Sequence, residues 1–518
     1  MHGVAAPERP AEASGRLLAR NSVLNFSGLI VPLLVGLVAI PFAVMGLGKE
    51  GFGVLAITWI VLGYFGLFDF GLSRATTKFM AEVIGRREIE RAAEIFWTAL
   101  IVAFCLGLVG ALVLAAATPL LAGRLLRIPP DLVPQALTSF RIVALSVPLI
   151  LCSSSLRGVL EASRRFDLVN MVMIPASMMS FVIPGLSYPF RLRLPEVVLL
   201  LVCSQAVTAA VLLSMCFRLY PTLKRRARLN VENLKRMASY GGWVSLTNVI
   251  SPVLVYMDRL FIGSLISMTS VTFYSAPYEM VTRLRAFATA ISTTLFPEFS
   301  SLSEAGGGGR LEMLFARGSK YVLLSVGSLV VLLFLLGDWF LDVWLGREFV
   351  QHSSGVFKVL ALGVLVNSLA TIAFNLLQGV GRPDLPAKFH LLELPVYAVL
   401  LWLLVSRLGI LGAALAWTLR VTLDGVLLCA ASIRSYPRIL PSLRANRVGR
   451  ALVLVLAAFA LAVAVDAASV RAPAKLAVAI AGLLGGVACA WYCVVDEVER
   501  GLAVSLWQRL RFGRGAER

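Results

Sequence analysis

FWTALIVAFCLGLVGALVLAAA, residues 96–117, is a run of 22 residues without a charged side chain. An apolar helix of about 20 residues has the length needed to cross the hydrocarbon core of a bilayer. Similar runs recur along the chain, which is 58% hydrophobic, only 15% charged and has a mean hydropathy of +0.85. Water-soluble domains do not have this composition. The sequence therefore predicts an all-α polytopic membrane protein.

Windows of about 19 residues predict about fourteen transmembrane helices. They lie near residues 23–45, 52–72, 96–117, 137–160, 168–188, 197–217, 241–266, 271–297, 321–340, 357–378, 389–406, 410–432, 451–470 and 474–494. We expect two six-helix lobes, followed by a C-terminal helix pair. The expected segments are 1–22 (cytoplasmic), 23–219 (N-lobe), 220–240 (basic linker), 241–432 (C-lobe), 433–450 (cytoplasmic loop), 451–494 (last helix pair) and 495–518 (amphipathic cytoplasmic tail).

The distribution of Lys and Arg predicts the orientation of these helices. The net charge is +19, and the basic residues gather in alternate loops, most densely in PTLKRRARLNVENLKRM at residues 221–237. Because basic loops resist translocation, we expect this loop and both termini to be cytoplasmic. Short basic loops beside apolar helices are typical of contact with anionic lipids, so nucleic acid is not an expected partner. The first apolar run has no cleavage site after it and indicates a retained signal anchor.

Several residue types argue against catalysis, metals and cofactors. All seven cysteines fall in or at the ends of apolar runs, where they behave as small hydrophobes, and the three histidines are scattered. GLGKEG at residues 46–51 matches a dinucleotide-binding pattern but lies between two predicted helices, which indicates a tight turn. The longest expected outer loops, near 118–136 and 341–356, hold no catalytic set of side chains. We therefore expect no catalytic residue, no metal and no cofactor.

Charged residues inside the predicted helices are the candidate binding residues. Such a charge costs at least a few kcal/mol and tends to face a cavity or a partner. The run VYMDRLFIG at residues 255–263 contributes Asp258 and Arg259, and the next predicted helix contributes Glu279, Arg283 and Arg285. Counted from the turn between the two helices, Arg259 and Glu279 lie at similar depths and are expected to pair. Glu279 also has the i, i+4 spacing for a pair with Arg283.

This cluster has more arginines than acids, and arginine forks match phosphate oxygens. We therefore expect Arg283 and Arg285 to bind an anionic headgroup, while a purely structural role for Asp258 and Arg259 stays open. Arg420 and Asp424 form either a self-contained i, i+4 pair or part of the ligand site. Glu393 and Asp424 are candidates for ion coupling. Asn25 and Asn248 occupy similar places in the two lobes, which hints at an internal repeat.

The order of several motifs resembles the Wzx-type polysaccharide flippases of the MOP transporter superfamily, between about residues 20 and 430. They are NFSGLIVPLLVGLVAIPFAVMGLGKEGFGVLA, FDFGLSRATTKFMAE, GVLEASRRFDLVN, VYMDRLFIG, FYSAPYE, LFPEFS, WLGREF, LLQGVGRPD and GILGAALAW. The resemblance implies two lobes that open alternately to either side and move an oligosaccharide on a polyprenyl diphosphate, of the undecaprenyl type, across the inner membrane. It also implies cationic residues on the eighth helix, which Arg283 and Arg285 match. Membrane lipids and the polymerase and chain-length machinery are the implied partners.

The resemblance has limits. The related lipid II flippases carry arginines on the first two helices, whereas here the first predicted helix has none and the second has only Arg74 at its edge. The alternatives are a MATE-type exporter of cationic drugs, for which this cluster is too basic, and a membrane polysaccharide polymerase or ligase, which needs a larger outer loop. The sugar, the coupling ion and the oligomeric state are left open.

Overall fold

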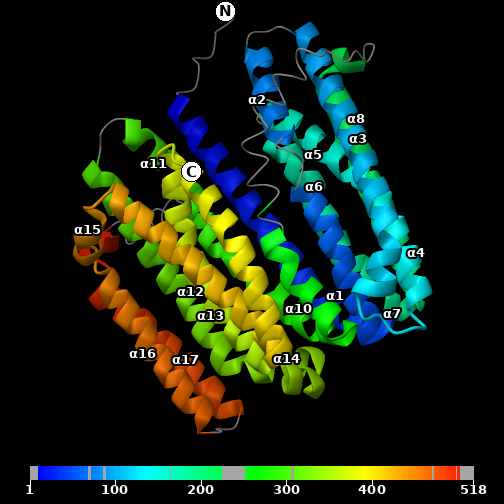
Figure 1. Ribbon diagram of the computed structural model, residues 1–518. Helices are drawn as coiled ribbons and strands as arrows, with labels where there is room; N and C mark the ends of the chain where they lie inside the picture. The colour runs from blue at the N-terminus through cyan, green and yellow to red at the C-terminus, as the bar shows by residue number, and fades with distance from the viewer. Residues whose placement is uncertain are drawn as a thin grey trace, which may run out of the picture. The chain divides into compact units, whose positions relative to one another are not determined.

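The computed structural model confirms an all-α polytopic membrane protein (Figure 1). It describes residues 10–67, 72–85, 89–163, 165–224, 250, 253–304, 308–468, 472–497 and 499–501, and every regular element in these ranges is helical. Ten helical segments within them are long and apolar enough to cross a bilayer. Their exposed faces carry large aliphatic side chains, such as Val109, Leu112 and Val113 on one helix. Such faces suit contact with lipid tails.

Two glycines explain part of the difference between ten and fourteen segments. Helix α1 (Pro10–Leu67) contains a kink at Gly48, whose φ is 71°. Helix α14 (Asp384–Ser435) contains another at Gly409, with φ 62°, between the predicted helices 389–406 and 410–432. A positive φ is strained for residues with a Cβ, so glycine reverses the chain there without a loop. The GLGKEG motif is therefore a turn between helices, as its sequence context predicts.

The expected outer loop at 341–356 is wrong. Helix α12 (Gly308–Leu345) and helix α13 (Arg347–Gly379) are separated only by Gly346, which has φ 91°. The N–H of Gly346 donates to the carbonyls of Leu341 and Asp342, a glycine ending of the kind that closes many helices. Polar residues after Gly346 extend the next helix instead of forming a loop.

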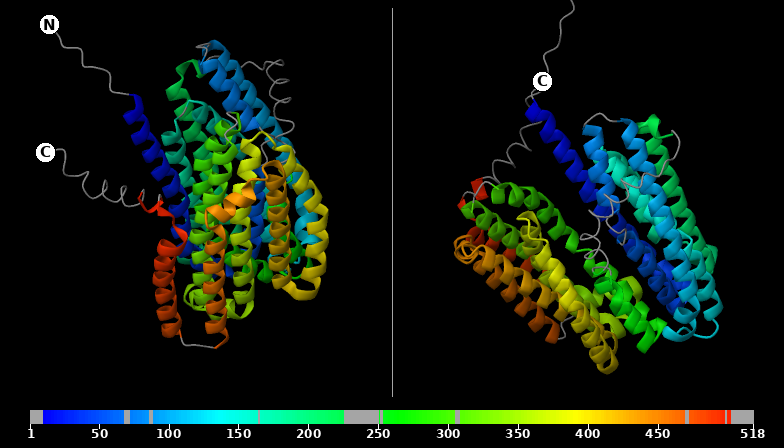
Figure 2. Two further views of the ribbon diagram at one scale, coloured as in Figure 1. Left: turned by 90° about the vertical axis from the view of Figure 1, so that its left-hand side faces the viewer. Right: turned by 45° about the horizontal axis from the view of Figure 1, so that its top comes forward.

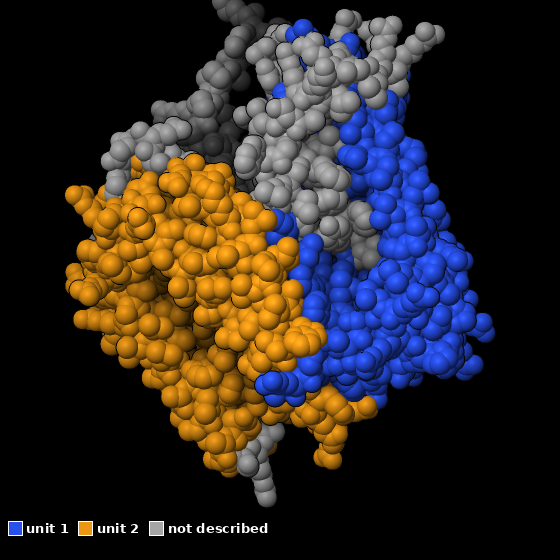
Figure 3. Space-filling view, viewed as in Figure 1, with its two compact units in different colours: residues 1–276, 405–410 blue, residues 277–404, 411–518 orange. Residues whose placement is uncertain are grey.

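The chain divides into two compact units (Figure 3). Unit 1 contains residues 1–276 and 405–410. Its elements are α1, α2 (Leu72–Gly85), α3 (Ile89–Leu120), the π-helical η1 (Leu121–Leu125), α4 (Val133–Ala144), α5 (Ser146–Ala162), α6 (Phe166–Gly185), α7 (Ser187–Phe190), α8 (Leu194–Leu219), the 3-10 turn η2 (Pro221–Lys224), a helix over 253–265 and the first part of α10 (Met268–Thr282).

The core of unit 1 forms where α2, α3, α5 and α8 meet. Met80, Phe96, Leu160 and Leu212 are buried there against one another. Small residues let the helices approach closely: a Cβ on Gly107 of α3 would lie 2.4 Å from the Cα of Pro148 on α5. This use of small side chains is common between helices in membranes.

Unit 2 contains residues 277–404 and 411–518. Its elements are the rest of α10, α11 (Arg285–Glu304), α12, α13, α14 apart from residues 405–410, α15 (Ile439–Ala445), α16 (Val448–Ala467), α17 (Ala472–Cys489) and the π-helical η3 (Ala490–Val494). Helix α12 packs on α11, α13, α16 and α17, and α16 and α17 lie side by side (Figure 2). These contacts place the C-terminal helix pair against α12.

The start of the predicted C-terminal tail is fixed to unit 2 by charge. Lys320 of α12 is fully buried, and its Nζ lies 2.7 Å from both carboxylate oxygens of Glu499. Arg317 and Tyr321 also contact Glu499, and Arg317 reaches Asp496. Burial acts to raise the pKa of Glu499, but hydrogen bonds from Lys320 and from the amide of Asp496 outweigh it, so the pKa lies below its usual value. The rest of the tail, residues 502–518, lies outside the described residues.

Candidate functional site

In unit 1, the run VYMDRLFIG connects its own helix to α10. Asp258 and Arg259 are both buried, on the helix over 253–265. The carboxylate of Asp258 accepts hydrogen bonds from the hydroxyl of Tyr274 on α10, at 2.6 Å, and from the backbone N–H of Arg259, at 2.7 Å. The Arg259 guanidinium lies 5.7 Å from the ring centre of Tyr256. Because both oxygens of Asp258 are bonded within the protein, a structural role fits this residue better than ligand binding.

Tyr274 was not singled out from the sequence, although a signal for it exists. Asp258 lies eight residues before Ile266 and Tyr274 eight residues after it, so the hairpin places them at one depth. The proposed pairing of Arg259 with Glu279 stays a prediction, because the two residues belong to different units.

The turn after the first predicted helix is bound to the same hairpin. The hydroxyl of Thr272 donates to the carbonyl of Lys49, and that of Thr269 to the carboxylate of Glu50 at 3.1 Å. A Cβ on Gly53 would lie 2.1 Å from the carbonyl oxygen of Met268. The backbone carbonyl of Lys49 and the carboxylate of Glu50, both in GLGKEG, therefore join α1 to α10.

The predicted eighth transmembrane helix, 271–297, is not continuous. It is interrupted between α10 and α11 at Arg283 and Leu284, where turn bonds run from the Leu284 N–H to the Val281 carbonyl and from the Ala286 N–H to the Arg283 carbonyl. Arg283 stands in the break, and Arg285 is the first residue of α11.

The arginines at this break differ in their contacts. Arg283 forms the predicted i, i+4 ion pair with Glu279, at 3.7 Å, and both side chains are about a quarter exposed. Arg285 is exposed, and its charge interacts with those of Arg420 and Tyr278. The break therefore gathers two arginines, with a third on α14 within electrostatic reach.

A second polar cluster lies between the two halves of α14. The guanidinium of Arg420 is 3.9 Å from the carboxylate of Glu393, and Asp424 is 3.8 Å from Nε2 of His390. A self-contained pair of Arg420 with Asp424 is one of the two alternatives that the sequence leaves open; in its place the structure pairs Arg420 with Glu393. Glu393 lies sixteen residues before the kink at Gly409 and Asp424 fifteen after it, so the two halves bring them to one level.

Aromatic side chains hold this cluster in place. The His390 ring stacks on Phe374 of α13, with centroids 6.4 Å apart, and the Arg420 guanidinium lies 5.7 Å from the ring centre of Tyr397. Helix α13 lies close against α14 at Gly363. A Cβ at this position would lie only 2.5 Å from the Trp417 side chain, so the close approach requires glycine. His390 belongs to this cluster although the three histidines are scattered in the sequence, because its neighbours are the carboxylates of Glu393 and Asp424.

Two sequence candidates cannot be placed. Asn248 lies outside the described residues, and so does the side chain of Asn25, whose backbone is part of α1. The proposed internal repeat based on these two residues stays a prediction.

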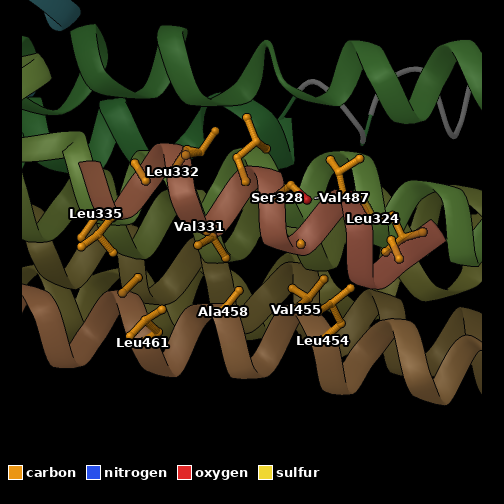
Figure 4. A pocket seen from close by; sticks show the side chains of 17 residues that line it. Leu324, Ser328, Val331, Leu332, Leu335, Leu454, Val455, Ala458, Leu461 and Val487 are labelled. Carbon is orange, nitrogen blue, oxygen red and sulfur yellow. Dashed lines mark hydrogen bonds between the residues drawn. The ribbon is translucent and has the colours of Figure 1, made fainter. Parts of the chain in front are cut away.

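An apolar pocket of about 160 Å³ lies between α12, α16 and α17 in unit 2 (Figure 4). Aliphatic side chains of α12 and α16, among them Val331, Leu335 and Val455, line it, and Ser328 is the only lining residue with a polar side-chain atom. This pocket contains no group that binds a charged headgroup, which sets it apart from the arginines of α10, α11 and α14.

The helices and their buried charges define a multi-pass membrane protein with the architecture of a helical transporter. Residues 46–354 match the family described as "Polysaccharide biosynthesis protein", and the chain belongs to that family. A "Putative O-antigen transporter" of Shigella flexneri is 28% identical over 415 residues, which cover 79% of this chain and 96% of the relative.

Two solved structures share the fold. The lipid II flippase MurJ in an inward closed conformation superposes with a TM-score of 0.69 at 13% identity, over 92% of this chain and 99% of that one. An inward-facing multidrug resistance MATE transporter of the MOP superfamily superposes with a TM-score of 0.67 at 15% identity, over 81% and 99% of the two chains. At these identities the similarity establishes the fold, and it confirms the MATE and MurJ-like architecture that the sequence motifs imply.

Proposed function

We propose that this protein is a flippase that moves oligosaccharides linked to a polyprenyl diphosphate, of the undecaprenyl type, across the cytoplasmic membrane by alternating access, for surface polysaccharide synthesis. The family, the O-antigen transporter relative and the fold shared with a lipid II flippase support this proposal. Both termini lie on the cytoplasmic side in this proposal, and the protein performs no covalent chemistry. The polymerase and chain-length machinery are its proposed partners.

The interruption of the eighth helix at its arginines is the observation that carries the proposal. A broken helix inside a membrane is tolerated where it lines a site, and the N-terminal end of α11 carries the positive end of its helix dipole. Arg285 stands at that end, and Arg283 stands two residues before it. Two guanidinium groups and a helix N-terminus attract a diphosphate, whose oxygens match the arginine forks. The same charges repel a cationic drug.

One observation favours the second candidate, a cation exporter of the MATE type. Glu393 and Asp424 are buried acids in unit 2, and a cationic substrate needs such acids. They are, however, already contacted by Arg420 and His390. We therefore rank the anionic substrate first.

Binding of a short polyprenyl diphosphate to the purified protein in lipid nanodiscs tests the headgroup site. We expect Arg285→Ala to weaken binding about tenfold to a hundredfold, as removal of a charge-assisted hydrogen bond worth about 1.5–3 kcal/mol predicts. Arg285→Lys keeps the charge but loses the fork, and should fall between Arg285→Ala and the unmodified protein.

The matched control is Arg310→Ala, because the Arg310 side chain is 65% exposed and its ion pair with Glu298 is long, at 3.9 Å. If Arg310→Ala weakens binding as much as Arg285→Ala does, the effect reflects overall charge and the headgroup site is wrong.

A further inference from the structure

The cluster of His390, Glu393 and Asp424 buries two carboxylates, and the groups around it do not neutralise both negative charges. One ligating atom from each side chain lies within 4.8 Å of the others. Glu393 is fully buried and Asp424 is 6% exposed. Both carboxylate oxygens of Glu393 and Oδ1 of Asp424 are buried without a hydrogen bond. Burying two carboxylates at this separation requires compensation, because like charges in an apolar medium repel strongly.

The neighbouring positive charges do not complete this compensation. Within the part of the chain that the structure describes, Arg420 is the cation paired with the cluster, through Glu393. Arg285 on α11 interacts with Arg420 and with Tyr278 of α10, rather than with the carboxylates. Among the described residues, Tyr397 and Cys429 also lie beside the cluster, and both are neutral in their ordinary state. Two carboxylates and one guanidinium leave one negative charge in excess.

We propose that the cluster binds one exchangeable proton, shared between Glu393, Asp424 and His390, and that this proton is linked to headgroup binding through Arg420. A proton suits the cluster better than a metal ion for two reasons. The Arg420 guanidinium stands 3.9 Å from Glu393 and repels a metal. An imidazole nitrogen is a poor ligand for sodium, which prefers oxygen, but accepts a proton near neutral pH.

The linkage follows from the position of Arg420, and this part rests on the proposed function. Arg420 neutralises Glu393, and its charge also interacts with that of Arg285 beside the helix break. When an anionic headgroup attracts Arg420, the carboxylates lose their cation and take up a proton. Conversely, protonation of the cluster releases Arg420 for the headgroup. By thermodynamic reciprocity each event favours the other.

Infrared difference spectroscopy of the ligand-free protein in nanodiscs tests the proton site without any substrate. We expect a buried carboxyl band that appears at low pH and disappears at high pH, and that is lost in Glu393→Gln and reduced in Asp424→Asn. Asp131→Asn removes an exposed carboxylate of unit 1 and should leave the band unchanged. A band that persists in both cluster variants, or a cluster that stays ionised over the whole pH range, overturns the proposal. So does a spectrum that responds to sodium but not to pH.

Calorimetric binding of farnesyl diphosphate, measured in buffers of different ionisation enthalpy, tests the linkage. Binding should take up about one proton in the unmodified protein, and the pH dependence of the affinity should follow that uptake. Glu393→Gln should bind without proton uptake, whereas Asp131→Asn should behave as the unmodified protein does. Binding without proton uptake in the unmodified protein contradicts the linkage.

The two proposals fail in different ways. If the infrared band is present but no diphosphate lipid binds, the proton site stands and the flippase proposal fails. If diphosphate lipid binds and the band is absent, the flippase proposal stands and the proton site fails.

Discussion

Lys320 illustrates how a fully buried charge is stabilised in this protein. Its ammonium group contacts both oxygens of Glu499, whose side chain is only 4% exposed. Removal of one member of a buried ion pair leaves the other unpaired and costs about 3–5 kcal/mol, whereas removal of both is often neutral. Lys320→Met should therefore lower the unfolding midpoint in detergent strongly, and Lys320→Met combined with Glu499→Gln should restore most of it. A double variant no more stable than the single one would contradict this account.

The same pair predicts a pH dependence of stability. The pKa of Glu499 is lower in the folded than in the unfolded protein. Its contribution to the free energy of unfolding is therefore complete above the unfolded pKa, about 4.5, and is lost as pH falls through the folded pKa. The melting temperature of the unmodified protein should therefore fall below about pH 4.5, and Glu499→Gln should fall less steeply. If the melting temperatures of the two proteins fall equally steeply with pH, Glu499 is not the cause of the pH dependence.

Residue types were predicted better than residue partners. The buried charges of VYMDRLFIG and of α14 stood out in the sequence because charges are rare in apolar helices. Their partners depend on how two helices face each other, which spacing along one helix does not report. Asp258 bonds Tyr274, and Arg420 pairs with Glu393 on the other half of α14. Counting residues outward from each hairpin turn is the signal that recovers both pairs.

At the scale of elements, glycines with positive φ decide where helices end. Gly346 joins α12 to α13 in a backbone conformation that costs about 1–3 kcal/mol for other residues. Gly346→Ala should lower the unfolding midpoint, measured by thermal denaturation in detergent. Gly449→Ala is the matched control, because Gly449 is helical and a Cβ there meets no atom within 4 Å. Equal midpoints for the two variants would show that the turn at Gly346 is not strained by a side chain.

The break in the eighth predicted helix was not foreseen. Pro277 lies within α10, before the break, and the break itself consists of Arg283 and Leu284. No proline or glycine at the break therefore signals the interruption in the sequence. Hydropathy windows average over such a break. The apolar runs of α3, α8 and α16, in contrast, were predicted closely, because length and composition alone determine a membrane helix.

At the scale of the whole molecule, composition predicted the class of protein and the motif order predicted its family, which the family match confirms. The two six-helix lobes and the cytoplasmic position of both termini stay predictions. The proposed function depends on whether the arginines at the helix break bind a diphosphate headgroup, which no apolar pattern encodes.

Flipping of a fluorescent oligosaccharide on an undecaprenyl diphosphate, measured in proteoliposomes, tests whether this protein is a diphosphate-lipid flippase. We expect the unmodified protein to move this lipid between leaflets, Arg285→Ala to lose most of the rate and Arg310→Ala to keep it. A protein that moves no diphosphate lipid but exports cationic dyes would contradict the account and establish a cation exporter instead.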